Sequence, residues 1–217
     1  MSLKRLVIVG AGAFGRELLG WARAIPASER DWEPAGFLDT NPDALEGFPC
    51  DLSVLGDEKT YELKGDELFA CGLTQPDIKL KVCRALQARG ATFVSVIHPR
   101  AIIGPHCRIG VGCAICPNVV LTNNVLVGNF VTINLSVGVG HDTVIADGCT
   151  INPGVQVGGK AILDEGVFVG SMAAVLERLR VGSYARIGSG SVVISRVPDR
   201  WTVMGVPARR LRLHGSA

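Results

Sequence analysis

Aliphatic residues recur at every sixth position along the second half of the chain. From Ile97 to Val193, all seventeen positions spaced six residues apart are Ile, Leu or Val, with no slip in register. A second series begins at Ala101 and ends at Val197, and among its seventeen members only Leu179 is larger than valine. A repeat this long, made of units this short, predicts a solenoid in which each coil buries its inner face against its neighbours.

Each six-residue unit predicts one flat face of that solenoid. One large and one small aliphatic residue would point inward, and equivalent residues would stack from coil to coil at about 4.8 Å, the spacing of paired strands. Glycine follows the large aliphatic residue in eight of the seventeen units. We expect these glycines to ease the corner between one face and the next.

The first ninety residues follow a different pattern, in which buried strands alternate with helices. Strands are expected at residues 4–9, 34–38, 67–71 and 92–96, and helices at 16–24 and 77–89. This order predicts a small α/β domain with space for about four strands, roughly half of a dinucleotide-binding fold. We therefore expect an α/β half-Rossmann-like domain at residues 1–94, an all-β solenoid at 95–197 and a C-terminal tail at 198–217.

A glycine-rich turn connects the first strand to the first helix. Its sequence, GAGAFG, places Gly10, Gly12 and Gly15 in the G-x-G-x-x-G spacing that lets a backbone approach a phosphate at a helix N-terminus. Asp39 and Thr40 follow the second strand, where an acidic residue can bind a ribose hydroxyl. A half-size domain suits a nucleotide-sugar better than NAD, and an alternative is that the glycines only pack the helix on the strand.

Composition narrows the class of protein. Lys and Arg number 22 against 20 Asp and Glu, a net charge of +2 that gives no basis for binding nucleic acid by bulk electrostatics. No apolar run reaches the length of a membrane span and the first residues lack the apolar core of a secretory signal, so we expect a cytoplasmic protein. The odd number of cysteines, seven, argues against a disulfide framework. Cys113 and Cys116 form no second pair for zinc, and no metal site is expected.

One histidine combines exposure with a neighbouring acid. His141 lies two residues after an inward valine and so outside the coil, Asp142 follows it directly, and Asn134 lies seven residues earlier. Imidazole is the natural base for removing a proton near neutral pH, and a carboxylate on its other ring nitrogen fixes the tautomer. Acyl transfer from a thioester needs such a base. From the residues alone, a structural, solvent-facing His141 is an equal alternative.

The order of motifs along the chain resembles a known family. GAGAFGRE, GFLD, the hexapeptide run, VGHDTVIADGCTINPG and MGVPARR together resemble the hexapeptide-repeat sugar acetyltransferases of the PglD, NeuD and perosamine type, over essentially the whole chain. The resemblance implies a left-handed parallel β-helix and a homotrimer with acetyl-CoA in the groove between adjacent β-helices. It also implies a nucleotide-linked amino sugar, of UDP or GDP type, as the acceptor.

The resemblance also assigns roles to residues. It implies His141 as general base, Asp142 as its acidic neighbour and Asn134 as a contact to the acceptor amine. The residues that it places at the nucleotide-sugar are Gly10, Gly12, Ala13, Phe14, Gly15, Asp39, Thr40 and Gly72. Those that it places at acetyl-CoA are Thr150, Gly159, Ser189, Pro207 and Arg209. Thr150 stands where several members have a histidine, and Ala13-Phe14 replaces a frequent Gly-His, so these positions depart from the family.

These observations predict an acetyl-CoA-dependent N-acetyltransferase that transfers the acetyl group directly to the amine of a nucleotide-sugar. Three alternatives stay open: O-acetylation of a sugar of the sialic acid type, a non-catalytic nucleotide-sugar-binding protein and, third, an NAD-dependent enzyme.

Overall fold

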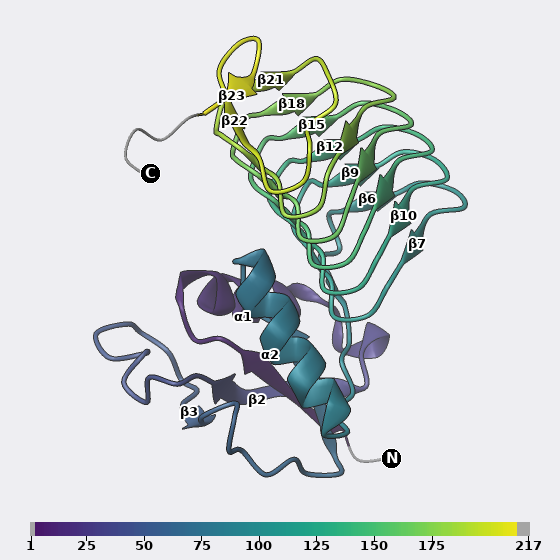
Figure 1. Ribbon diagram of the computed structural model, residues 1–217. Helices are drawn as coiled ribbons and strands as arrows, with labels where there is room; N and C mark the ends of the chain where they lie inside the picture. Colours follow the sequence, from purple (N-terminus) through teal and green to yellow (C-terminus); the bar gives the residue numbers. More distant parts are fainter. Residues whose placement is uncertain (1–2, 212–217) are drawn as a thin grey trace, which may run out of the picture.

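The chain folds into a small N-terminal α/β region and a long solenoid of parallel strands. The computed structural model describes residues 3–211. Figure 1 shows the α/β region beside the first coils, while the solenoid leads away from it toward the C-terminal end. Both parts share one continuous apolar cluster, which runs from Leu6 of the first strand to Val203 near the far end.

A four-stranded parallel sheet forms the centre of the N-terminal region. Its strands are β1 (Lys4–Val9), β2 (Trp32–Leu38), β3 (Val54–Gly56) and β4 (Glu67–Cys71), in the spatial order β3-β2-β1-β4. Helix α1 (Ala13–Ala24) connects β1 to β2, a short 3₁₀ helix, η1, covers Ala27–Glu29, and helix α2 (Pro76–Ala88) follows β4. The expected order of strands and helices is confirmed, although the sequence pattern missed β3. The strand expected at 92–96 is reduced to one bridge, between Phe69 and Phe93.

The solenoid consists of seventeen two-residue strands, one for each repeat unit. The strands are β5 (Val96–Ile97), β6 (Ile102–Ile103), β7 (Arg108–Ile109), β8 (Ala114–Ile115), β9 (Val120–Leu121), β10 (Leu126–Val127), β11 (Thr132–Ile133), β12 (Gly138–Val139), β13 (Val144–Ile145), β14 (Thr150–Ile151), β15 (Gln156–Val157), β16 (Ile162–Leu163), β17 (Phe168–Val169), β18 (Ala174–Val175), β19 (Arg180–Val181), β20 (Arg186–Ile187) and β21 (Val192–Val193).

Each strand pairs with the strand three places further along the chain. Leu126 of β10 lies beside Val144 of β13, and Gly138 of β12 beside Gln156 of β15, a separation of one three-strand coil. The pairing generates three sheets, which carry β5-β8-β11-β14-β17-β20, β6-β9-β12-β15-β18-β21 and β7-β10-β13-β16-β19. The six-residue repeat is therefore confirmed as three faces per coil.

Both aliphatic series point inward, as predicted. Ile133, Ile151 and Leu163 of the first series and Val119, Val155 and Val167 of the second are completely buried. The prediction holds less well at the first coil, where Ile103 is 37% exposed because no further coil covers it. The small inward positions also hold the thiols of Cys113 and Cys149, whose burial raises their pKa to about 11 and about 12.

The corners of the solenoid are made differently from our expectation. From residue 106 to residue 190, each sixth residue adopts a left-handed backbone conformation, and only five of these fifteen positions are glycine. The turn therefore falls three residues after the large aliphatic residue. The glycines directly after that residue serve close approach instead, since a Cβ at Gly140 would lie 2.5 Å from the backbone nitrogen of Gly159 in the next coil.

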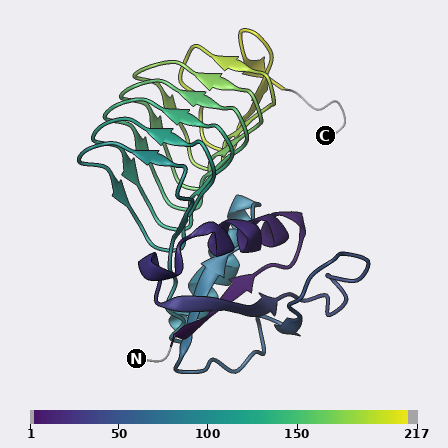
Figure 2. The same cartoon turned by 180° about the vertical axis from the view of Figure 1, so that it is seen from behind.

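The C-terminal segment folds back on the last coils. Strand β22 (Thr202–Met204) pairs parallel with β20, and β23 (Arg209–Arg210) pairs antiparallel with β22. Figure 2 shows this hairpin closing the end of the solenoid that lies away from the α/β region. Residues 198–211 are thus an extension of one sheet of the solenoid.

Candidate active site

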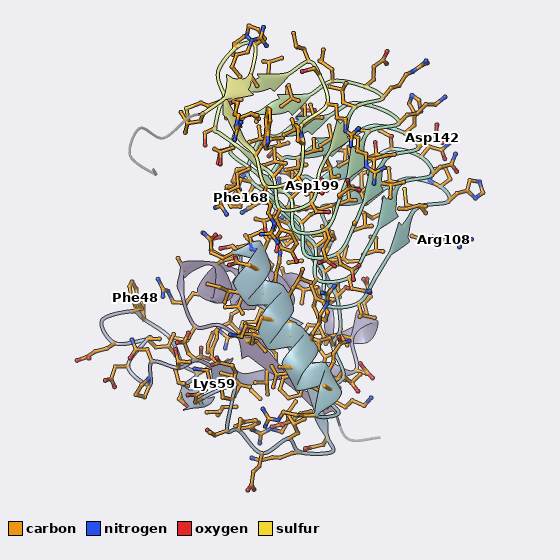
Figure 3. The ribbon with its side chains drawn as sticks, in the orientation of Figure 1. Phe48, Lys59, Arg108, Asp142, Phe168 and Asp199 are labelled. Carbon is orange, nitrogen blue, oxygen red and sulfur yellow. The ribbon has the colours of Figure 1, made fainter. Side chains whose placement is uncertain are left out.

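The side chains of His141 and Asp142 form a hydrogen-bonded pair on an outer corner of the solenoid. The pair follows strand β12, and 59% of the His141 side chain is exposed. His141 Nδ1 lies 2.8 Å from Asp142 Oδ2. Figure 3 shows Asp142 at the outer edge of the solenoid, away from Phe168 of β17. With Nδ1–H directed to the carboxylate, Nε2 keeps its lone pair and can accept a proton.

A second hydrogen bond holds the carboxylate in place. Asn124, one coil earlier, donates its Nδ2–H to Asp142 Oδ1 at 3.0 Å. Asp142 itself occupies the left-handed corner position, with φ +58°, a conformation that aspartate tolerates. The hydrogen bond with His141, and after it that with Asn124, lowers the pKa of Asp142, so the carboxylate stays ionised at neutral pH.

The imidazole of His141 lies against the backbone of Gly159 in the next coil. A Cβ built on Gly159 would be 2.7 Å from His141 Nε2 and 3.0 Å from two ring carbons. Any side chain at this position would therefore displace the ring. The structure brings three predicted residues together here, His141, Asp142 and Gly159, and Nε2 lies beside the half-buried Gly159.

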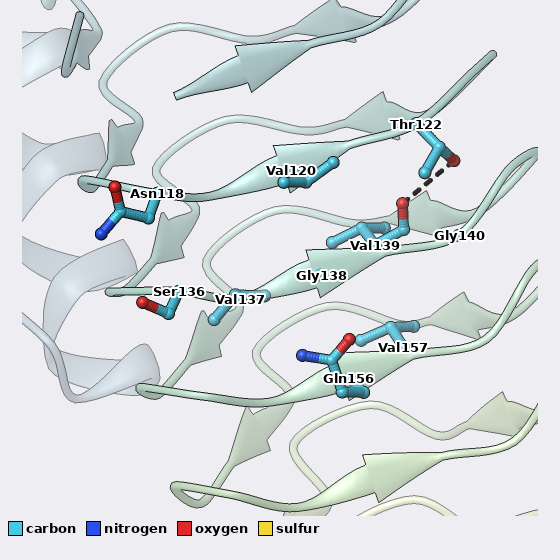
Figure 4. A pocket seen from close by; sticks show the side chains of 10 residues that line it. All are labelled: Asn118, Val120, Thr122, Ser136, Val137, Gly138, Val139, Gly140, Gln156 and Val157. Carbon is cyan, nitrogen blue, oxygen red and sulfur yellow. Dashed lines mark hydrogen bonds between the residues drawn. The ribbon is translucent and has the colours of Figure 1, made fainter. Parts of the chain in front are cut away.

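Asn134 belongs to a different edge of the solenoid. It follows β11, whereas His141 follows β12, and its Oδ1 accepts the backbone N–H of Leu135 at 2.7 Å. A shallow depression of about 400 Å³ covers the sheet face between these two edges. Figure 4 shows Ser136 at one margin of this depression and Gly140 at the other. Within one chain, a whole face of the coil separates Asn134 from His141.

Three of the predicted nucleotide-site glycines are buried packing residues. A Cβ on Gly15 would lie 1.9 Å from the carbonyl oxygen of Gly10, and a Cβ on Gly72 would lie 2.9 Å from the same oxygen. The amides of Gly10 and Gly72 already donate to Leu38 and Val9. These three glycines therefore pack the helix against the strands, and their contact with a nucleotide stays a prediction.

Gly12 differs from the other glycines of the turn. It is the N-cap of α1 with no capping side chain, it is exposed, and a Cβ built on it would meet nothing within 4 Å. Ala13 beside it is exposed as well, whereas the side chain of Phe14 is buried against Trp21. Phe14 therefore offers only its backbone to a ligand, and the open part of the turn is Gly12-Ala13.

Asp39 holds the glycine-rich turn to the end of β2. Its Oδ2 accepts the N–H of Ala11 at 2.8 Å, and its Oδ1 accepts the N–H of Asn41 at 2.9 Å. Thr40 is exposed next to it. The carboxylate oxygens retain further lone pairs, so Asp39 both shapes the turn and borders the open surface beside Gly12.

The residues that the resemblance places at acetyl-CoA are dispersed. Ser189 and Pro207 are exposed, as is Arg209 in the C-terminal hairpin, where a recess of about 140 Å³ adjoins it. Thr150 requires a correction, because its side chain is completely buried. The Thr150 hydroxyl donates to the carbonyl of Thr74 at 2.7 Å and lies 2.9 Å from Lys79 Nζ, so it serves the junction of the two regions.

Sequence reasoning missed Lys79. This lysine belongs to α2 and its side chain is completely buried. Its spacing from Pro76 and Cys83, three and four residues, places it on the buried stripe of α2 and was the one available signal. Within residues 3–211, no group of His, Cys, Asp and Glu is arranged to hold a metal ion, and neither helix is long and apolar enough to cross a membrane.

Comparisons with known proteins agree with this architecture. No model of a protein family matches the chain. GDP-perosamine N-acetyltransferase of Escherichia coli O157:H7 is 30% identical over 215 residues, which cover 94% of this chain and 95% of that protein. The chain belongs to the hexapeptide-repeat sugar acetyltransferases. The solenoid is accordingly a left-handed β-helix, as the sequence resemblance implied.

Solved structures of this family superpose over almost the whole chain. A histidine-to-alanine variant of GDP-perosamine N-acetyltransferase from Caulobacter crescentus, in complex with CoA and GDP-perosamine, has a TM-score of 0.86 at 25% identity and covers 95% of this chain and 96% of its own. The acetyltransferase domain of PglB from Neisseria gonorrhoeae has a TM-score of 0.85 at 25% identity, with 96% and 100% covered.

A further similarity covers only part of each chain. Serine acetyltransferase of Synechococcus elongatus is 37% identical over 90 residues, which cover 38% of this chain and 37% of that protein's length.

Proposed function

We propose that this protein transfers the acetyl group of acetyl-CoA to the amino group of a nucleotide-linked amino sugar. The observation that carries the proposal is the His141–Asp142 pair, which is exposed on the solenoid with Nε2 against Gly159. The full-length relative and the neighbour that binds CoA and GDP-perosamine support the same activity and favour a GDP-linked acceptor.

The chemistry is a direct transfer. The neutral sugar amine attacks the thioester carbonyl, a C–N bond forms, and the C–S bond breaks as CoA leaves as its thiolate. His141 Nε2 takes the proton that the amine nitrogen loses and returns it to the thiolate. Asp142 fixes the tautomer and stabilises the imidazolium, and the backbone N–H of Gly159 is the proposed donor to the developing oxyanion.

The α/β region would hold the nucleotide. The strand order β3-β2-β1-β4 matches the first four strands of the dinucleotide-binding order 3-2-1-4-5-6, in which the first glycine-rich turn binds phosphate, and this supports the assignment. The uncapped first turn of α1, open at Gly12 and Ala13, suits a diphosphate because its backbone N–H groups point outward. Asp39 and Thr40 border this opening and are the expected contacts for the nucleoside.

The complete site would need two copies of the chain, and we expect a homotrimer. Asn134 and His141 occupy opposite margins of one sheet face, so both can reach one amine only when different copies provide them. The outer faces of the solenoid are apolar enough for such contacts, with Ile102, Leu126 and Ile162 at 63%, 43% and 37% exposure. In that groove Ser189, Pro207 and Arg209 are the expected acetyl-CoA contacts, and Arg209 suits a phosphate.

The test is release of free thiol from acetyl-CoA in the presence of GDP-, UDP- and dTDP-linked amino sugars. We expect release with one GDP-linked amino sugar, and a loss of about 10²- to 10⁴-fold in kcat for His141→Ala, the range typical of a general base. His106→Ala, at an exposed solenoid corner, is the matched control. Release only with hydroxyl sugars would replace the proposal by O-acetylation. Full activity of the folded His141→Ala variant would show that His141 is not the general base.

A further inference from the structure

Lys79 lies completely buried where helix α2 meets the solenoid. Its Nζ is 3.1 Å from Thr132 Oγ1, 2.9 Å from Thr150 Oγ1 and 3.1 Å from the carbonyl oxygen of Cys149. Thr132 and Thr150 are paired neighbours on β11 and β14. One amine from the α/β region therefore joins two successive coils of the solenoid.

The hydrogens of this cluster can be counted. The Thr150 hydroxyl gives its hydrogen to the Thr74 carbonyl, so it can only accept from Lys79. An ammonium group would donate to all three oxygens and leave the buried Thr132 hydroxyl hydrogen with no partner among the described residues. A neutral amine would donate to Cys149 and Thr150 and accept from Thr132, which satisfies every hydrogen of the cluster.

The groups that face Lys79 provide no carboxylate. Its titratable neighbours are four thiols, Cys71 at the end of β4, Cys83 on α2, and Cys113 and Cys149 from the solenoid. Among residues 3–211, no acidic side chain is within ion-pair distance of Nζ. Burial of the amine in this apolar junction lowers the pKa of Lys79.

The cluster also connects the two halves of the proposed site. Thr74 follows Gly72, which packs on Gly10 and Gly15 of the nucleotide turn. Asn134 directly follows strand β11 and lies two residues after Thr132. A second contact, from Arg186 Nη2 to Gln75 Oε1 at 3.3 Å, ties the same loop to the solenoid.

We propose that Lys79 is a positioning residue, whose neutral buried amine fixes the nucleotide-holding region at the distance and angle that acetyl transfer beside Asn134 requires. The inference rests on the proposed function, because it assumes that the nucleotide is held at one end of this connection and the amine at the other. Lys79 contacts neither substrate and acts only through the loop 72–75 and strand β11.

The protonation state can be measured without any activity. The chain has six lysines, so protein labelled with ¹³C at lysine Cε gives six resonances, and Lys79→Arg identifies that of Lys79. We expect the Lys79 resonance to show the neutral form at pH 8 while the other five remain charged. An ammonium resonance for Lys79 at pH 8, with or without a thiolate at Cys71, would overturn the proposal.

The positioning role is tested by comparing Lys79→Met with Lys81→Met, an exposed position on the same helix. We expect Lys79→Met to lower kcat for the nucleotide-linked sugar by about 10- to 100-fold, the cost of slight misplacement, with an unchanged KM for acetyl-CoA. Slow transfer to the free amino sugar, which lacks the nucleotide, should be equal in wild type and both variants.

The outcomes separate the two proposals. Equal losses with the free and the nucleotide-linked sugar would mean general damage to the solenoid and would overturn the positioning role, as would wild-type kcat in Lys79→Met. A wild-type enzyme inactive toward every amino sugar would refute the proposed function, while the lysine resonance would still decide the state of the amine. If Lys79→Met does not fold, Lys79→Arg, which keeps a donor but carries a fixed charge, takes its place with the same expected loss.

Discussion

The solenoid and the α/β region encode their structures in different ways. In the solenoid, equivalent positions repeat in each coil, so an inward valine such as Val155 has the same task as Val137 and Val167. In the α/β region no position has an equivalent: three glycines, at 10, 15 and 72, are packing residues, whereas Gly12 leaves the turn open. A functional residue in the solenoid can therefore be recognised because it departs from the repeat. In the α/β region, functional residues must be distinguished from packing residues one by one.

The α/β region is expected to be most sensitive to substitution at Gly15. In Gly15→Ala the new Cβ would lie 1.9 Å from the Gly10 carbonyl, so helix α1 must move away from the sheet. We expect a loss of stability of about 1–3 kcal/mol or more, confined to the α/β region. The matched variant Gly12→Ala, with open space around its Cβ, should keep its stability and lose nucleotide affinity.

Hydrogen exchange measured by mass spectrometry distinguishes the two regions in these variants. Gly15→Ala should expose residues 4–38 to exchange while the strands from β8 onward stay protected. Equal stability of Gly15→Ala and Gly12→Ala would contradict the assignment of packing to one glycine and binding to the other.

A smaller change tests the contact between His141 and Gly159 in the solenoid. Gly159→Ala would place a methyl group 2.7 Å from His141 Nε2 and push the imidazole off the backbone. We expect kcat to fall by about tenfold or more with little change in melting temperature, because the imidazole is exposed and free to move. Gly159 has no left-handed backbone conformation, and Gly65→Ala, at an exposed glycine that shares this property and whose Cβ would meet nothing within 4 Å, is the control. A normal kcat in Gly159→Ala would show that the ring position is immaterial.

The smallest expected effect concerns pH and the junction of the two regions. Because burial lowers the pKa of Lys79 in the folded state, the unfolded chain binds more protons between that pKa and about 10.4, the ordinary lysine value. The free energy of unfolding contributed by Lys79 should therefore rise with pH through this window and be lost as pH falls. We measure the free energy of unfolding in urea for wild type, for Lys79→Met and for the control Lys81→Met. The value for wild type should rise relative to that for Lys79→Met from pH 7 to pH 10. A difference independent of pH would contradict the lowered pKa.

Most of the fold could be predicted from the sequence because the inward-facing residues of the solenoid recur every six positions. The two aliphatic series defined the faces and inward positions from Ile97 to Val193, and the glycine-rich turn marked the first strand and helix. The three-residue strand β3 was missed because Val54–Gly56 has no periodicity of its own and depends on pairing with β2. The glycines that follow the large aliphatic residues were wrongly assigned to the corners. Their role is to allow close contact between neighbouring coils, and that contact exists only in the stacked structure.

The site could be predicted only where its residues are local. His141 and Asp142 are adjacent, and their pairing follows from position alone. Thr150 and Lys79 were not predictable, because their contact joins residues 71 positions apart across two regions. The sequence resemblance placed Thr150 at the cofactor. It could not reveal that the Thr150 hydroxyl is already hydrogen-bonded to Thr74 and Lys79 of the α/β region.

The proposed enzyme requires that Asn134 of one copy and His141 of another form a single site. Two variants, His141→Ala and Asn134→Ala, each expected to be nearly inactive, should be unfolded together in equal amounts, refolded and assayed by thiol release. With copies assembled at random, about one quarter of the sites would combine an intact histidine with an intact asparagine, so we predict recovery of about a quarter of wild-type activity. Variants refolded separately and then assayed without exchange serve as the reference. If the mixed assemblies are no more active than these separate variants, the two residues do not share a site between copies and the account is contradicted.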